Sequence, residues 1–189
     1  MTVAIEMVLS PRPLERTDGE IAVVGFFTDE RPLRGGAARA DWRLCGGLSR
    51  RIESGELSGK SGEALLIGSG RALLAPRLLL LGLGDRQVFD RSSVSHELEQ
   101  AMDRVLKLGC TRVALAPLGI EMDDIPRHAA ALVAGIRDGW RASERPMSLK
   151  LCVPIAEIPA VHRALDNARK AANASEISIE APEPSRARP

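Results

Sequence analysis

Aromatic residues are scarce in this sequence, which contains no tyrosine, three phenylalanines and two tryptophans among 189 residues. Proteins that hold single-stranded nucleic acid stack the bases on aromatic side chains, so this composition argues against a base-stacking surface. Charge of one sign is not in excess either, since the formal net charge is +1. No overall field therefore draws the chain to nucleic acid or to anionic lipid.

Lysine is also scarce, because only four of the 26 basic residues are lysines and the others are arginines. The planar guanidinium group of arginine matches phosphate oxygens, which makes phosphate recognition one reading of this bias. The arginines are dispersed along the sequence, and genome base composition explains the bias more simply. We therefore expect no nucleic-acid partner.

Three cysteines, Cys45, Cys110 and Cys152, are odd in number and far apart, with no C-x-x-C spacing. This pattern predicts small buried hydrophobes in a reducing compartment, and neither a disulfide framework nor a zinc site. No window approaches 18 apolar residues, and the first residues lack the basic and apolar regions of a signal peptide. The sequence thus predicts a cytoplasmic protein with no membrane partner.

Hydrophobic runs and periodic apolar spacing alternate along the chain. The runs predict strands at Val3–Leu9, Ile21–Phe27, Ala64–Ile67, Leu78–Leu81, Arg112–Ala116, Ser148–Val153 and Ile177–Ile179. The periodic spacing predicts helices at Asp41–Ser54, from Ser92 or Ser93 to Lys107, from Asp124 to Trp140, and from Pro159 to Ala168. Trp42, Cys45, Leu48 and Ile52 share one face of the first helix, with Gly55 at its carboxyl end.

From Leu78 onward strands alternate with helices, which favours right-handed crossovers onto a parallel sheet. The earlier strands have fewer intervening helices and suggest a mixed sheet. We therefore predict a three-layer α/β domain, with a largely parallel sheet flanked by helices, over residues 1–180. Residues 181–189 are expected to form a disordered tail.

Several short motifs follow one another in a distinctive order. They are the run IAVVGFF at Ile21–Phe27, Gly46-Gly47-Leu48, the turn Gly59-Lys60-Ser61-Gly62-Glu63, Gly82-Leu83-Gly84, Val113–Leu118 and Gly135–Gly139. Their order and spacing resemble the amino-terminal domain of the leucyl aminopeptidase family. The resemblance implies a macro-domain-like fold that packs beside a catalytic domain and contributes to a hexamer.

The same resemblance locates the family's chemistry outside this kind of domain. Family members hold two metal ions with Lys, Asp and Glu ligands around an N-T-D-A-E-G-R-L phrase in the carboxy-terminal domain, and this sequence contains no such phrase. The adjacent Asp123 and Asp124 are better explained as the start of a helix. We accordingly predict no catalytic residue, no metal ligand and no cofactor.

Glycine-rich turns supply the candidate ligand-binding residues, which are Gly82, Gly84, Gly68, Gly70 and Lys60. Backbone near such glycines can approach a phosphate closely, and open α/β sheets bind ligands beyond their strand ends. The competing interpretation is that these glycines only allow the chain to turn, and that Lys60 is an exposed turn residue. The G-x-G-x-x-G fingerprint is incomplete, and the G-K-S letters at Lys60 precede a strand where a P-loop precedes a helix. The Asn-rich and glycine-rich loops of ADP-ribose-binding macro domains are not recognisable.

Other reactive side chains form no recognisable constellation. His96, His128 and His162 fall on predicted helices and are expected to be solvated. Ser61 and the Ser92-Ser93 pair have no neighbouring histidine and acid in the sequence, although triads assemble in space.

The combined interpretation is a non-catalytic interaction, assembly or regulatory module. Two alternatives stay open: a small-ligand or nucleotide-binding macro-like domain, and one half of a split leucyl aminopeptidase whose partner is a separate catalytic domain. Self-association, most simply a two-fold dimer, is also expected. Trp42 or Trp140 could lie on a contact face, but their periodic spacing favours the core for both.

Overall fold

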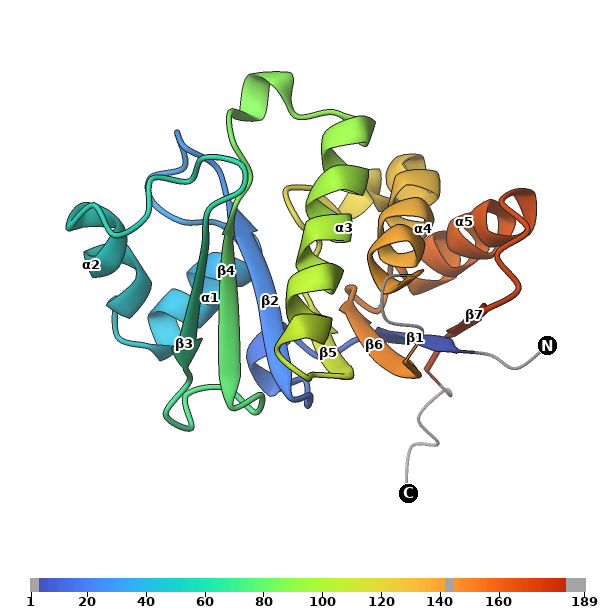
Figure 1. Cartoon of the computed structure of the whole chain (residues 1–189), viewed down its shortest axis with the longest axis horizontal. Helices are drawn as coiled ribbons and strands as arrows, with labels where there is room; N and C mark the ends of the chain where they lie inside the picture. The colour runs from blue at the N-terminus through green and yellow to red at the C-terminus, as the bar shows by residue number, and fades with distance from the viewer. Residues whose placement is uncertain (1–3, 142–144, 183–189) are drawn as a thin grey trace.

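Seven strands form one sheet, in the order β3-β4-β2-β5-β6-β1-β7. The computed structural model describes residues 4–141 and 145–182. The strands are β1 (Ile5–Ser10), β2 (Ile21–Phe26), β3 (Ala64–Gly68), β4 (Arg77–Gly82), β5 (Arg112–Leu115), β6 (Met147–Cys152) and β7 (Ile177–Glu180). Among the strands of the described residues, only β3 runs antiparallel to its neighbour. The predicted mixed, largely parallel sheet is therefore confirmed (Figure 1).

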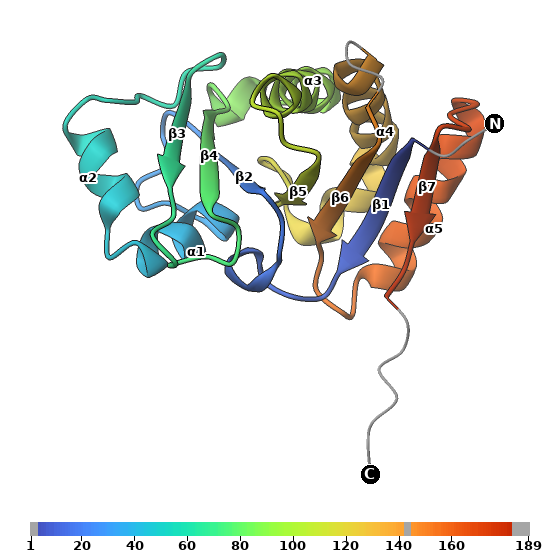
Figure 2. The same cartoon turned by 60° about the horizontal axis from the view of Figure 1, so that its bottom comes forward.

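Helices cover both faces of this sheet, as Figure 2 shows. They are α1 (Gly35–Arg43), α2 (Gly47–Glu53), α3 (Arg91–Lys107), α4 (Ile125–Arg141) and α5 (Ile158–Ala171), with short 3-10 helices η1 (Leu14–Arg16), η2 (Arg86–Val88) and η3 (Met122–Asp124). Buried side chains of α3, α4 and α5 share one core cluster, while those of α1 and α2 belong to a second cluster on the other face. The domain thus has three layers.

Strand β2 explains why the middle of the sheet is so apolar. Its residues alternate between the two core clusters, with Val23 in one cluster and Ala22 and Val24 in the other. A strand buried on both faces needs a continuous apolar run, which is the pattern that identified it in the sequence.

The single helix predicted over Asp41–Ser54 is wrong, because the structure divides it. Cys45 and Gly46 have φ of +53° and +77°, a left-handed conformation that ends α1 before α2 begins. The break rotates the two halves, so Trp42 is 76% exposed and Cys45 is exposed, while Leu48 and Ile52 remain buried. The expectation that Cys45 is buried fails for the same reason, whereas Cys110 and Cys152 are buried.

Other features of the helices agree with the sequence. Gly55 and Gly109 have φ of +81° and +73° directly after the caps of α2 and α3. Asp90, and neither of the expected serines, is the N-cap of α3. Trp140 packs against the larger core cluster, as its spacing predicted.

Two predictions concern the ends of the chain and its relation to membranes. Most of the expected tail, residues 183–189, lies outside the described residues. Within the described ranges, no helix is long and apolar enough to cross a bilayer.

Candidate functional site

The switch-point cleft lies where the carboxyl ends of β2 and β5 meet. These strands are neighbours, yet the chain leaves them in opposite directions: β2 leads to α1 and the β3-β4 edge, and β5 leads to α4 on the other face and then to β6. Open α/β sheets bind ligands at such a point, because the diverging connections leave a crevice between them. Topology therefore singles out the loops after β2 and β5.

The cleft has two connected compartments. A smaller one, of about 210 Å³, is lined by the loops after β2, β4 and β5, including Glu30, Arg34, Arg86 and Gly119. The second, of about 450 Å³, has mainly apolar walls from Leu14, Pro117, Val153 and other residues. Both compartments are lined by Gly35, Gly36, Ala116, Pro117 and Met122. The amino end of α1 thus lies at the junction between a polar and an apolar space.

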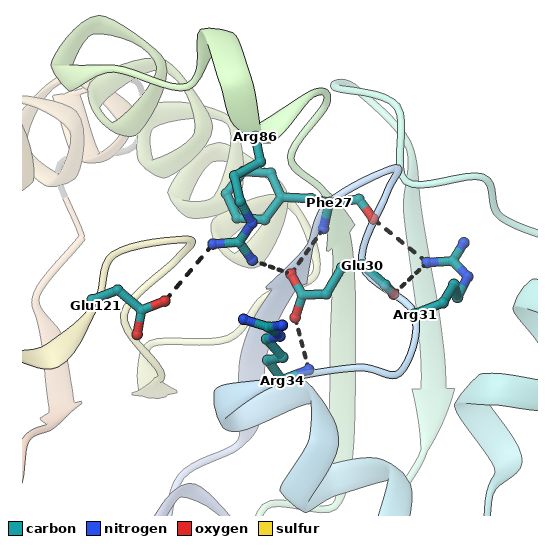
Figure 3. Close-up of polar contacts among 6 residues, drawn as sticks. All are labelled: Phe27, Glu30, Arg31, Arg34, Arg86 and Glu121. Atoms are coloured by element: carbon teal, nitrogen blue, oxygen red, sulfur yellow. Dashed lines mark hydrogen bonds and ion pairs between the residues drawn. The ribbon is translucent and has the colours of Figure 1, made fainter.

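Glu30 organises the polar compartment (Figure 3). Its side chain is only 5% exposed. One carboxylate oxygen accepts a hydrogen bond of 2.7 Å from the Arg34 backbone N–H. The other accepts from Nη2 of Arg86 at 2.8 Å and from the Phe27 backbone N–H at 3.4 Å. A buried carboxylate that satisfies its oxygens in this way fixes the loop between β2 and α1.

Arg86 links the three loops around the cleft. Besides its ion pair with Glu30, it lies 3.8 Å from Glu121 in the loop after β5. Its guanidinium carbon stands 4.2 Å from the centre of the Phe27 ring, and that ring meets Phe89 edge to face. Stacking and charge together hold Arg86 in one orientation. The cleft wall is therefore a fixed arrangement before any ligand arrives.

Two features of the cleft favour an anion. The N–H groups of the first turn of a helix have no acceptor within that helix, and they carry the positive end of its dipole. In α1 these groups belong to Gly35, Gly36 and Ala37, which all line the polar compartment. Arg34 lines it too, and its guanidinium makes no ion pair with any residue that the structure describes. A phosphate group is the ligand that such an arrangement fits.

Glycine is required at both loops for steric reasons. A Cβ on Gly36 would lie 2.5 Å from the Cβ of Ala116. Gly119 has φ of +68°, and a Cβ there would lie 2.6 Å from the Phe27 ring. The loops after β2 and β5 consequently approach each other to a distance that only glycine permits.

The apolar compartment also contains Cys152, whose thiol contacts Thr17 Oγ1 at 3.4 Å. Burial raises the pKa of this thiol to about 11. Cys152 is accordingly a neutral thiol at physiological pH and adds no negative charge to the compartment.

The predicted ligand-binding glycines fall at two different places. Gly82 and Gly84 end β4 and lie against the Gly59–Lys60 backbone: Gly84 donates to the Gly59 carbonyl at 2.8 Å, and a Cβ on Gly82 would lie 2.1 Å from the Lys60 carbonyl oxygen. Here glycine permits a close backbone contact, and Lys60 is exposed as expected. Gly68 pairs with Arg77 at the opposite end of β4, and Gly70 follows it. One small ligand cannot contact both groups.

The cleft residues Glu30, Gly35, Gly36, Arg86 and Gly119 were not predicted from the sequence. Residues 29–36 read as a polar loop, and no motif distinguishes Glu30 from a solvated carboxylate. The usable signal was the pair Gly35-Gly36, which forms the start of α1, because glycines at a helix start let an anion approach the backbone N–H groups.

The three histidines do lie on helices, but only His96 is exposed. His128 and His162 are half-buried, and His162 Nε2 lies 3.3 Å from the Ile179 carbonyl oxygen. The expectation that all three are solvated is therefore wrong for two of them. In the part of the chain that the structure describes, no group of three or more His, Cys, Asp or Glu could hold a metal ion.

Comparison with known proteins identifies the family. The profile of the cytosol aminopeptidase family, N-terminal domain, matches residues 23–140. The chain belongs to this family. Among curated members, a probable cytosol aminopeptidase of Nitrosococcus oceani is 31% identical over 102 residues, which cover 54% of this chain and 20% of that protein. One from Pseudomonas syringae pv. tomato is 31% identical over 130 residues, covering 65% and 25% respectively. This family domain thus spans about a fifth to a quarter of the curated relatives.

Solved structures confirm the macro-domain-like fold of the family domain. A variant of tomato leucine aminopeptidase superposes with a TM-score of 0.68 and 17% identity, covering 89% of this chain and 36% of that one. An Oceanobacillus iheyensis macrodomain variant with ADPR gives 0.64 and 10% identity, covering 87% and 92%. A Trypanosoma brucei macrodomain in complex with ADP gives 0.64 and 14% identity, covering 85% and 68%.

Proposed function

We propose that this chain is a non-catalytic binding module whose switch-point cleft takes a nucleotide with a diphosphate group. The observation that carries the proposal is the junction of the two compartments, where Gly35 and Gly36 present the first-turn amides of α1. The diphosphate would lie at these amides and beside Arg34. The base would enter the apolar compartment, and the polar compartment would receive the ribose or other group beyond the diphosphate.

Size and fold both support this assignment. The larger compartment, of about 450 Å³, has a volume typical of small-molecule sites, and the smaller one adds about 210 Å³. Two macrodomains of similar fold were solved with ADPR and with ADP. The aminopeptidase reaction has no support in these residues, because the sequence lacks the metal-site phrase that the family resemblance implies. A cytoplasmic location agrees with the name of the curated relatives, probable cytosol aminopeptidase.

Isothermal titration with ADP and ADP-ribose tests the proposal. We expect saturable binding that weakens about tenfold in Arg34→Glu, because the charge reversal places a carboxylate beside the phosphate. The matched control is Arg163→Glu on α5, an exposed arginine outside the cleft, which should bind like the wild type. No binding of either nucleotide, or equal loss in both variants, would contradict the proposal.

A second candidate function is assembly, either with another copy of the chain or with a separate aminopeptidase catalytic domain. Strand β3 favours it, because β3 is an edge of the sheet and contains no charged residue or proline. Natural proteins usually protect such edges with charge, proline or a bulge. Leu66, at its centre, is 41% exposed.

A further inference from the structure

A second hollow, the arginine groove, adjoins the cleft. It has a volume of about 580 Å³ and is lined by Arg12, Arg16, Arg43 and Arg71, with Glu15 as its one acidic lining residue. These residues come from the loop after β1, from η1, from the end of α1 and from the loop after β3. Pro11, Arg12 and Pro13 line both the groove and the apolar compartment. The groove therefore continues the path that starts at the amino end of α1.

The charge of the groove is not neutralised by the protein. Glu15 is already approached by a fifth arginine, Arg39, at 3.8 Å. The hydrogen bond from Lys150, at 2.7 Å, is the main cause that lowers the pKa of Asp18, and the charge of Arg12 contributes least. Arg12, Arg16 and Arg71 form no ion pair with a carboxylate in the described parts of the chain. Four of the arginines that are dispersed in the sequence, at positions 12, 16, 43 and 71, therefore converge here.

Contacts hold the Arg43 side chain in place, and the backbone of Arg71 is strained. The Arg43 side chain donates from Nε to the Ala72 carbonyl at 3.0 Å, and its guanidinium carbon lies 6.0 Å from the Trp42 ring centre. Arg71 has φ of +71°, a left-handed backbone conformation that residues other than glycine and asparagine rarely adopt. Backbone strain of this kind concentrates at functional positions, where the side chain is needed in spite of its cost.

We propose that the arginine groove binds a phosphate group, and that the ligand is a nucleotide with a further phosphate on its ribose. The 5′ diphosphate lies at the amino end of α1, and the further phosphate, on the 2′ or 3′ oxygen, reaches the groove past Arg12. A guanidinium group can donate two parallel hydrogen bonds to the oxygens of one phosphate. An open groove lined by four arginines therefore suits a phosphate dianion. This assignment rests on the proposed nucleotide function and narrows it to a class of nucleotide.

Titration calorimetry with three probes tests the assignment: adenosine 5′-monophosphate, adenosine 2′,5′-bisphosphate and adenosine 3′,5′-bisphosphate. These differ only in the second phosphate. We expect at least one bisphosphate to bind about tenfold more tightly than the monophosphate, with an advantage that shrinks as salt rises. Arg16→Gln should remove the advantage and leave monophosphate binding unchanged. Arg163→Gln, a distant exposed arginine, should retain it.

The outcomes separate this inference from the proposed function. Equal affinity for all three probes overturns the second phosphate site and leaves nucleotide binding in the cleft intact. An advantage that survives Arg16→Gln and Arg71→Gly together overturns the groove as its location. Failure of all three probes and of ADP to bind overturns both.

Discussion

Single residues in this domain show how position gives a side chain its role. Glu30 and Glu15 are both acidic residues in polar stretches, yet Glu30 accepts three hydrogen bonds at the cleft. Glu15 stands among arginines at the groove. No property of either residue in the sequence separates the two cases, because the difference arises from partners as distant as Arg86. Functional assignment at this scale therefore required the structure.

Asp90 allows a test at the scale of one carboxylate. It caps α3 by accepting hydrogen bonds from Ser92 Oγ and from the Ser93 backbone N–H. These bonds lower the pKa of Asp90 from 3.8 to about 2. Because the folded pKa is the lower one, the cap stabilises the fold above about pH 4, and its contribution disappears as pH falls toward 2.

We therefore expect Asp90→Ala to melt at a lower temperature than the wild type between pH 6 and pH 8. The gap should narrow below pH 4 and close near pH 2. Thermal melts by circular dichroism between pH 2 and pH 8 measure this difference in melting temperature. The control is Asp123→Ala, which removes a carboxylate on η3. A gap that does not change with pH would show that the ionised cap is not the cause.

Secondary-structure elements were the most predictable level. Continuous apolar runs predict the strands β2, β4 and β5 directly, because each of these strands is buried on both faces. The break between α1 and α2 could not be read, because the apolar spacing runs through it and only the φ of Cys45 and Gly46 reveals the turn. The periodic apolar spacing shows which residues would share one face of a continuous helix. A local left-handed turn breaks that helix, so the residues on its two sides no longer share a face.

The contact between α3 and α4 makes a prediction at this scale. A Cβ on Gly135 would lie 2.4 Å from the Ser95 carbonyl oxygen and 2.8 Å from the Leu98 Cβ. Gly135→Ala should therefore destabilise the fold by about 1–3 kcal/mol, in spite of alanine's better helix propensity. Urea unfolding measures this difference.

Gly68→Ala, at the end of β3, is the matched control, because a Cβ there meets no atom within 4 Å. It should change the free energy of unfolding by less than about 0.5 kcal/mol. If the two variants unfold at the same urea concentration, close packing at Gly135 is not what joins α3 to α4.

At the scale of the whole molecule, the fold class followed from the order of elements, but the cleft did not. The walls of its polar compartment come from residues 25–37, from Arg86 and from residues 116–122, which only the sheet order brings together. The arginine groove likewise unites positions 12, 16, 43 and 71. Sequence spacing contains no information about such convergence without the strand order.

Assembly is the second property of the whole molecule. If β3 pairs with β3 of another copy, light scattering after size exclusion should give about twice the 20.3 kDa of one chain. Leu66→Lys should shift the mass toward the monomer, because a charge at an edge strand opposes pairing. Val88→Lys, another exposed apolar position at 73%, should leave the mass unchanged. A monomer in the wild type would remove the support for assembly through β3.

Nucleotide binding in the switch-point cleft is the central claim, and an NMR titration of the ¹⁵N-labelled chain with ADP tests it most directly. The amide signals of Gly35, Gly36 and Gly119 should shift with one common affinity, because the diphosphate lies at the first turn of α1. Signals of Gly82 and Gly84, packed on the Gly59–Lys60 backbone, should stay in place. Shifts confined to Gly82 and Gly84, or no shifts at millimolar ADP, would contradict the account.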